Sequence, residues 1–140
     1  MSGNIEILLD SSTIILRKDE ILLVSPFKGA TIGPKEAKKI LDTIDQLSQY
    51  TKRAIIFDSR MASVNMEARV MLTNEQAAKS KHSMALLVPN LSIKVLANLS
   101  YFINRPTYPM RAFLTEKAAL IWSHKHLQRE NFELMYSSAA

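Results

Sequence analysis

Along the first part of the chain, short apolar runs alternate with polar clusters at a spacing typical of β-hairpins. The apolar runs cover residues 5–9, 13–16 and 21–25, and the clusters between them cover residues 10–12 and 17–20. Such short connections join antiparallel strands, because parallel neighbours need a longer crossover. The pattern therefore predicts an antiparallel β-structure at the start of the domain.

The next segment changes to helical spacing. Gly33 can act as the N-cap, Pro34 suits the first helical position, and Glu36 places a carboxylate in the first turn, where it complements the helix dipole. The apolar positions that follow are three or four residues apart and predict a helix with one buried face: Ala37, Ile40, Leu41, Ile44 and Leu47.

A continuous apolar run at residues 54–57 is predicted to be the central strand. It has the length and composition of a strand buried on both faces, and Asp58 marks its carboxyl end. Further strands are predicted at residues 83–88 and 110–114. Ligands and partners of open α/β sheets bind at the carboxyl ends of strands, because loops and helix N-termini converge there.

Three more helices are expected between and after these strands. Asn65 is a suitable N-cap for a helix over residues 66–79, and Thr115 caps a helix that reaches about residue 127. The first of these has a less regular apolar surface, formed by Met66, Val70, Met71 and Ala77. Residues 91–104 carry a helical stripe that is expected to face the sheet: Val95, Leu96, Leu99, Phe102 and Ile103.

The order of these elements predicts an α/β fold. Strands alternate with helices after residue 33, which indicates a mostly parallel sheet with an N-terminal antiparallel hairpin and about four helices. At 140 residues the chain fits one domain, residues 1–140. Residues 129–140 form a C-terminal extension that is too apolar for a free tail, so we expect it to pack on the domain or on a second copy through Phe132, Leu134, Met135 and Tyr136.

Composition excludes several function classes. The chain has 47% hydrophobic and 22% charged residues, no cysteine, and no apolar stretch long enough to cross a bilayer. We therefore expect a cytoplasmic protein without membrane insertion. A net charge of +5 would suit nucleic acid, but the lysines at residues 35–39 share a helix with acids and no stacking motif accompanies them. Solvated helix faces explain the charge better, so nucleic acid is an unlikely partner.

Several short motifs occur in an order that resembles a known family. They are IGPKEAKKIL at the first helix, AIIFDSR at the central strand, MEAR at the second helix, then MALLV and MRAFLTEKAALIW, and together they span almost the whole chain. The chain looks like a STAS-like domain of the SpoIIAA-like group, related to bacterial anti-sigma-factor antagonists and to CRAL-TRIO cores. The resemblance implies a βα superhelix that binds proteins or small molecules.

The resemblance also implies a phosphorylatable serine at the start of the second helix in the antagonist subgroup. The corresponding stretch here, Met66 to Arg69, contains no serine. Ser63 lies nearby and could accept a phosphate close to a helix N-terminus. A loop serine or an alternative cap is the favoured interpretation, so partner switching by phosphorylation is not expected.

Side chains near the end of the central strand are the candidate partner- or ligand-binding residues. An arginine that faces outward could bind a carboxylate or phosphate through its planar fork. The favoured alternative is structural, with Glu67 pairing with Arg60 or Asp58 capping local amides. The full candidate set is Asp58, Arg60, Ser63, Met66, Glu67 and Arg69.

Local motifs for catalysis, metals and cofactors are missing from the sequence. His124 and His126 are two residues apart and so point to different faces of a helix, which makes them surface histidines. His82 is clustered with Lys79 and Lys81, whose charges repel cations, so a transition-metal site is not expected. Three glycines cannot form a phosphate-binding loop, and no nucleophile elbow is present. We expect neither enzyme activity nor a metal or cofactor.

Two functions from different classes remain. The first is a non-enzymatic regulatory or scaffolding module that acts through protein–protein contacts, with a homodimer expected. The alternative is a carrier of an apolar small molecule or lipid, with a cavity between the sheet and the helices that bear Leu99, Phe102 and Trp122. Core filling is the default role of these apolar side chains.

Overall fold

The computed structural model describes residues 4–48, 51–73 and 81–139, and it describes side-chain surroundings in these ranges except at residue 81 and residues 128–139. Strands and helices alternate along the chain, as predicted. The strands are β1 (Ile5–Leu8), β2 (Ser12–Leu16), β3 (Leu22–Pro26), β4 (Thr31–Ile32), β5 (Arg53–Asp58), β6 (Ser63–Val64), β7 (Lys81–Leu87) and β8 (Met110–Phe113). The helices are α1 (Pro34–Ser48), α2 (Met66–Thr73), α3 (Leu91–Asn104) and α4 (Glu116–Ala139).

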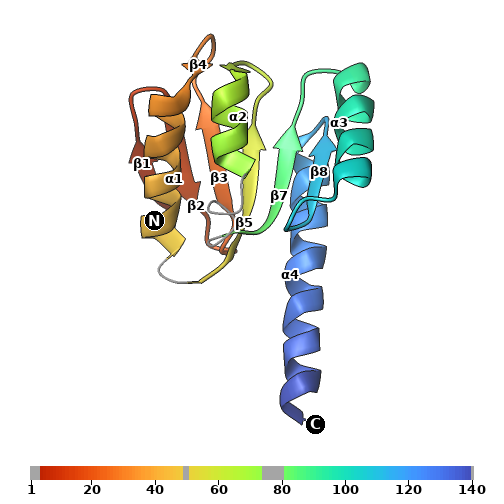
Figure 1. The fold of residues 1–140 in the computed structure, drawn as a ribbon. Coiled ribbons are helices and arrows are strands. Elements are labelled where there is room, and N and C mark those ends of the chain that lie inside the picture. Colours follow the sequence, from red (N-terminus) through yellow and green to blue (C-terminus); the bar gives the residue numbers. More distant parts are fainter. Residues whose placement is uncertain (1–3, 49–50, 74–80, 140) are drawn as a thin grey trace.

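The main sheet has six strands in the order β1-β2-β3-β5-β7-β8 (Figure 1). The first three are antiparallel, and β3, β5, β7 and β8 are parallel, which confirms both the antiparallel lead-in and the mostly parallel sheet. β5 lies between β3 and β7, and its Ala54, Ile55 and Ile56 are fully buried, as predicted for the central strand.

A separate two-stranded sheet was not predicted. β4 pairs in parallel with β6, so that Thr31 lies opposite Ser63. Runs of two residues are too short to give a recognisable alternation of apolar and polar positions, so the sequence pattern indicated only loops there. The pairing ties the start of α1 to the start of α2.

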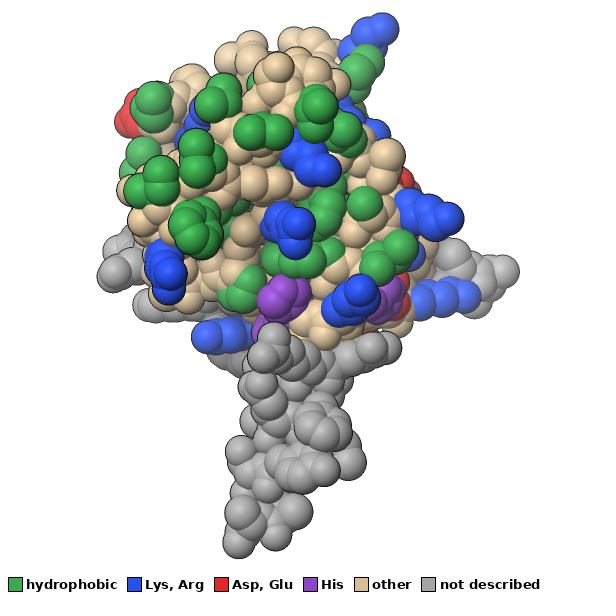
Figure 2. Space-filling model, turned by 90° about the vertical axis from the view of Figure 1, so that its right-hand side faces the viewer, with side chains coloured by type: hydrophobic (Ala, Val, Ile, Leu, Met, Phe, Trp, Pro, Cys, Tyr) green, Lys and Arg blue, Asp and Glu red, His purple; other side chains and the backbone are tan. Residues whose placement is uncertain are grey.

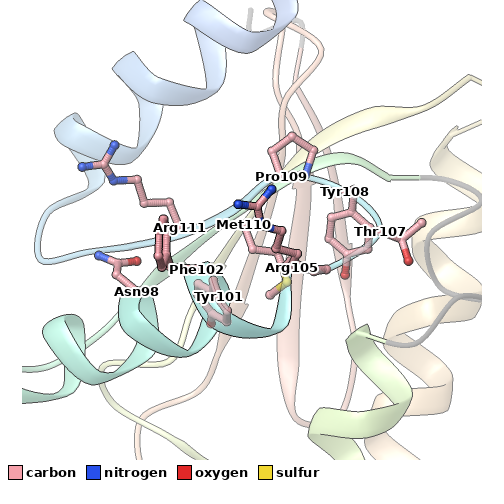
Figure 3. Close-up of a pocket in the computed structure, with 10 residues that line it drawn as sticks. Asn98, Tyr101, Phe102, Arg105, Thr107, Tyr108, Pro109, Met110 and Arg111 are labelled. Carbon is pink, nitrogen blue, oxygen red and sulfur yellow. The ribbon is translucent and has the colours of Figure 1, made fainter.

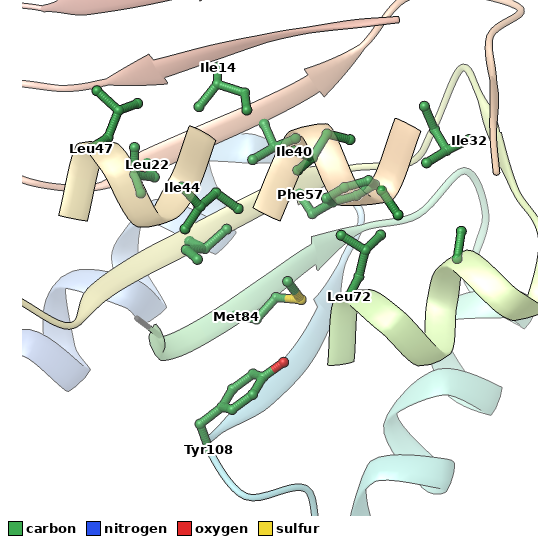
Figure 4. Packing of buried hydrophobic residues seen from close by; sticks show 14 residues of the cluster. Ile14, Leu22, Ile32, Ile40, Ile44, Leu47, Phe57, Leu72, Met84 and Tyr108 are labelled. Atoms are coloured by element: carbon green, nitrogen blue, oxygen red, sulfur yellow. The ribbon is translucent and has the colours of Figure 1, made fainter. Parts of the chain in front are cut away.

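α1 and α2 cover one face of the main sheet, and α4 covers the other (Figure 1). On the first face, side chains of α1 and α2 meet those of the strands in a continuous apolar cluster (Figure 4). On the second face, Ala54, Ala85 and Ala119 are fully buried between the sheet and α4. Small side chains at these positions let the helix backbone approach the sheet closely.

α1 begins and packs as its sequence predicts. The backbone amide of Gly33 donates to Oε1 of Glu36 at 2.9 Å, and the amide of Ala37 donates to the carbonyl of Gly33, which together cap the first turn. Ile40 and Ile44 are at most 1% exposed. The buried stripe of α1 is therefore confirmed.

The prediction that the stripe of α3 faces the sheet is wrong. All five stripe residues are between 52% and 72% exposed: Val95, Leu96, Leu99, Phe102 and Ile103. The reason is the position of α3, which packs chiefly against the edge strand β8 instead of over the face of the sheet. Helical spacing shows that a face is apolar, but it does not show where the helix is placed.

Asn98 explains how α3 is held at that edge. Its side-chain oxygen accepts a hydrogen bond from the amide of Ala112 at 2.7 Å, and its side-chain nitrogen donates to the carbonyl of Ala112 at 3.2 Å. The amide side chain thus takes the place of a further strand beside β8. An edge strand needs such cover because its free backbone groups otherwise pair with other chains.

α2 and α4 also differ from their predictions. Of the apolar surface expected on α2, Met66 and Val70 are exposed, whereas Met71 packs partly buried against the core. Ala68 and Leu72 form the buried side of the helix. The predicted continuation of α2 to residue 79, including Ala77, lies outside the described residues.

α4 does not end near residue 127 but continues as helix to Ala139, and Figure 1 shows it extending past the end of the sheet. The side chains of Phe132, Leu134, Met135 and Tyr136 lie outside the described residues, so the packing of the 129–140 extension stays a prediction. Within the parts of the chain that are described, no helix combines the length and apolarity that a membrane span requires.

Candidate functional site

Asp58 and Arg60 form an ion pair at the carboxyl end of β5. Nε and Nη2 of Arg60 lie 2.9 Å and 2.8 Å from the two carboxylate oxygens of Asp58, and the backbone amide of Arg60 also donates to Asp58 at 3.0 Å. Partial burial favours a higher pKa for Asp58, but the hydrogen bonds and charge of Arg60 outweigh it and lower the pKa. Asp58 thus caps a local amide, as the structural interpretation predicted.

The other predicted site residues are only partly brought together. Ser63 is exposed in β6, with its amide bonded to the carbonyl of Ala30, and it does not cap α2. Asn65 is that cap, because its side-chain oxygen accepts from the amide of Ala68 at 2.9 Å. Met66, Glu67 and Arg69 are exposed on α2, and no ion pair joins Glu67 to Arg60 among the described side chains.

The charged rim, as we call Asp58 and Arg60 at the carboxyl end of β5, lies beside a shallow pocket of about 390 Å³. The pocket brings Arg60 and Ser63 together, but Met66, Glu67 and Arg69 do not line it. The guanidinium of Arg60 already donates two hydrogen bonds to Asp58, so these donors are not available to an external carboxylate or phosphate. The lining consists of Lys28, Gly29, Ala30, Arg60, Met61, Ala62 and Ser63.

His124 and His126 are both partly exposed, and each contacts another side chain of the chain. Nε2 of His124 lies 3.0 Å from Asp19, which also accepts hydrogen bonds from Arg17. Burial favours a higher pKa for Asp19, but the bonds from Arg17 and the Ile21 amide and the charges of Arg17 and His124 outweigh it and lower the pKa. His126 packs edge-on against Trp122, at 4.5 Å between ring centroids. The described residues contain no group of three side chains suited to hold a metal ion.

Half of the exposed large hydrophobic side chains in the described chain belong to α3. Figure 2 looks onto the edge of the sheet that carries α3 and shows hydrophobic side chains spread over that face, with lysine and arginine among them. The exposed fractions amount to about four fully exposed large side chains, or on the order of 500 Å², as large as the largest patch on a typical monomer. The residues are Leu91, Ile93, Val95, Leu96, Leu99, Phe102 and Ile103.

A pocket of about 580 Å³ continues this surface between the C-terminal half of α3 and β8 (Figure 3). Its wall includes the rings of Tyr101, Phe102 and Tyr108 and the basic side chains of Arg105 and Arg111. Burial raises the pKa of Tyr101, although the charge of Arg69 on α2 opposes that rise. The pocket is thus an aromatic hollow with a basic rim.

The basic residues on this side have no acidic partner in the described chain. Arg105 follows α3 with φ of 33°, in the left-handed region, and its guanidinium lies 6.0 Å from the ring centre of Phe102. Arg111 lies 5.8 Å from the ring centre of Phe113. No carboxylate among the described side chains forms an ion pair with Lys94, Arg105 or Arg111. The α3 surface is therefore apolar at its centre and positive at its margin.

The sequence held one signal for this surface that periodicity alone did not use. Lys94 is the only charged residue in the 14 residues of α3. A helix that is apolar on nearly all sides needs cover on nearly all sides. Among the described elements, β8 supplies most of that cover. The carrier hypothesis expects Trp122 to share a cavity with Leu99 and Phe102. Trp122 of α4 instead packs against Phe113 of β8.

Comparisons with known proteins agree with the fold. An uncharacterized protein from the DUF3478 family with a SpoIIAA-like fold, from Shewanella loihica PV-4, is similar in structure with a TM-score of 0.54 and 8% sequence identity. The match covers 88% of this chain and 95% of that chain. At this identity the likeness shows the fold alone, and it confirms the SpoIIAA-like fold that the sequence motifs implied.

No curated protein matches the chain in sequence. A family model described as "Domain of unknown function (DUF7793)" matches residues 14–127. Because that match spans well over half of the chain, this protein belongs to the DUF7793 family.

Proposed function

We propose that this protein is a non-enzymatic binding module, regulatory or scaffolding in role, that acts through protein–protein contacts. Its contact surface is the apolar side of α3. The exposure of seven large hydrophobic side chains on one helix carries this proposal. Contiguous apolar patches of this size, rimmed by polar residues, are typical of interaction sites.

The energy available from this surface is sufficient for association. Burial of on the order of 500 Å² of apolar area at about 25 cal/mol per Å² contributes roughly 12 kcal/mol before the costs of association are subtracted. Those costs are about 4–15 kcal/mol, so α3 alone supports a weak contact, and added surface makes a stronger one.

The charged rim around Asp58 supports a non-catalytic role. A general base works best when its pKa lies near the working pH. The Arg60 guanidinium lowers the pKa of Asp58 further below neutrality and occupies both carboxylate oxygens. The proposal therefore moves the main contact from this rim to α3 and keeps Met66 and Arg69, exposed on α2, as candidate peripheral contacts.

Light scattering over a range of protein concentrations tests the proposal. The wild type is expected to show a mass above that of one chain, and Leu99→Asp combined with Phe102→Asp is expected to reduce it to one chain. Both positions are exposed, so the fold should survive, which a circular dichroism melt checks. Met61→Asp is the matched control, because Met61 is also exposed and apolar but lies away from α3.

Met66→Glu extends the same experiment to the α2 rim, where a loss of mass would place Met66 in the contact. A strict monomer at every concentration that binds no protein would contradict the proposal.

The second candidate is an apolar-ligand carrier, and the pocket of about 580 Å³ beside β8 favours it. Its volume falls in the range of small-molecule sites, and Tyr101, Phe102 and Met110 line it. Native mass spectrometry of the purified protein tests this candidate. A copurified ligand that Met110→Trp displaces would support a carrier, whereas protein of bare-chain mass would exclude it.

A further inference from the structure

We propose that α3 is covered by the C-terminal half of α4, residues 128–139, from a second copy of the chain, in a reciprocal exchange. Each copy would lay the end of its long helix on the apolar side of the other copy's α3. This inference rests on the proposed function and names the partner of the same surface. Four observations support it: the length of the α4 extension, its apolar face, the charges of the two surfaces and the area that they would bury.

The direction and length of α4 fit this arrangement. The part of α4 that contains Ala119 packs on the sheet, and the helix then continues past the sheet, away from α3 of its own chain (Figure 1). At 1.5 Å per residue, the 12 residues 128–139 span roughly 18 Å and the 14 residues of α3 roughly 21 Å. The extension can therefore cover most of the length of α3 in a second copy.

The sequence of the extension gives it an apolar side. Phe132, Met135 and Tyr136 follow the i, i+3, i+4 spacing, which places them on one face of a helix. Leu99 and Phe102 of α3 have the same three-residue spacing, and both are exposed. Two helices with such faces pack by interlocking their side-chain ridges.

The charges favour the extension over a second α3 as the occupant. α3 contains no acidic residue, and Arg105 and Arg111 lie beside its C-terminal half. A direct antiparallel pair of α3 helices would bring Lys94 of one copy towards the arginines of the other. Residues 128–139 instead carry more acidic than basic residues, and Glu133, three residues from Tyr136, flanks the apolar face. Opposite charges across a contact favour association and fix its register.

The area also favours exchange between two copies. A stable interface usually buries about 800 Å² on each partner, and α3 alone exposes on the order of 500 Å². In a reciprocal exchange each copy contributes both its α3 and its extension. Every chain then buries two contacts, and the total exceeds the roughly 1,000 Å² expected of a biological interface.

A complementation experiment by light scattering tests the exchange on the full-length chain. One variant carries Leu99→Asp and Phe102→Asp in α3, and the other carries Phe132→Asp and Met135→Asp in the extension. Each variant alone has no intact contact and is expected to be a monomer. An equimolar mixture has one intact contact per pair, so it is expected to form heterodimers with a Kd weaker than that of the wild type.

Two results would overturn the exchange. If mixing leaves both variants monomeric, or if the extension variant keeps the wild-type mass, the extension is not the occupant of α3. In the second case, dissociation of the α3 variant alone would leave the proposed function intact and this inference refuted. The two ideas can therefore fail separately.

A charge reversal provides an independent test. Arg105→Glu with Arg111→Glu, and Glu133→Arg, are each expected to weaken dimer formation about tenfold or more, and their combination in one chain is expected to recover most of the loss. Losses that simply add would contradict the pairing.

Sedimentation with vesicles of phosphatidylglycerol and phosphatidylcholine tests whether a lipid surface, and not a second copy, covers α3. Vesicle binding by a monomeric wild type, lost in the α3 variant only, would overturn the exchange.

Discussion

α1 and α3 have similar lengths and the same helical spacing of apolar residues, yet the chain buries them very differently. Ile40 and Ile44 of α1 are at most 1% exposed, whereas Leu96 and Phe102 of α3 are 66% and 72% exposed. α1 lies over the face of the sheet, where strands and α2 surround its apolar side. α3 lies at the edge strand β8, its main neighbour among the described elements.

The polar sides of the two helices differ as well. α1 carries charged residues away from the sheet, and Lys38 and Asp42 pair there as neighbours on one face. α3 carries Lys94 alone. α1 thus has one buried side and one solvated side, whereas α3 has more apolar surface than the described part of its own chain covers. The stability of α1 is therefore internal to the domain, whereas we propose that α3 serves contacts between molecules.

The largest predicted effect concerns stability. Ile40→Ala is expected to lower the free energy of unfolding by about 2–5 kcal/mol, because it leaves a cavity beneath α1. Leu96→Ala on α3 is expected to change it by less than about 0.5 kcal/mol in dilute protein, where association does not contribute. Urea unfolding followed by circular dichroism measures both. Similar losses at the two positions would erase the contrast between the helices.

An intermediate effect is predicted at the attachment of α3 to β8. Asn98→Ala removes both hydrogen bonds to Ala112 and is expected to cost about 1–3 kcal/mol and to speed hydrogen exchange at the Ala112 amide. Asn104→Ala is the matched control, since Asn104 is an exposed residue of the same helix. Equal exchange rates at Ala112 in both variants would show that Asn98 does not hold the edge.

The smallest effect concerns the charged rim and its pH dependence. The folded-state pKa of Asp58 lies below its unfolded value of about 3.9, so the pair stabilises the fold above that pH, and the contribution is lost as the pH falls through the folded pKa. Because the pair is partly exposed, Asp58→Asn is expected to cost about 1 kcal/mol or less at pH 7 and to flatten the loss of stability below about pH 4.

The charged rim, unlike α3, is not expected to take part in association. Asp58→Asn is expected to leave the mass in solution unchanged, because the pair serves the loop and not the contact surface. Dissociation caused by Asp58→Asn at neutral pH would show that the charged rim, and not α3 alone, forms part of the contact surface.

Much of the fold was predictable because its local signals agree with one another. Residues 54–57 form an apolar run of strand length, and β5 is buried there. Gly33 and Glu36 form a recognisable helix start, and their hydrogen bond is present. Asn65 likewise caps α2. In each case the deciding interactions lie within a few residues, so the sequence contains them.

The candidate site was less predictable because it depends on the placement of whole elements. The stripe of α3 was read correctly as helical, but its burial depends on whether the helix lies over the sheet or beside β8. Asp58 and Arg60 are only two residues apart, and their pairing was still missed in favour of Glu67. Neither the neighbour of a helix nor the rotamer of an arginine follows from periodicity alone.

The reaction rate of a single thiol on α3 tests most directly whether a second copy covers this helix. The chain has no cysteine, so Leu96→Cys introduces the only thiol, and Met61→Cys provides an exposed control away from α3. We predict that a maleimide reacts with Cys at position 96 more slowly as protein concentration rises through the association range, while the rate at position 61 stays constant. Rates at position 96 that are fast and independent of concentration would contradict the account.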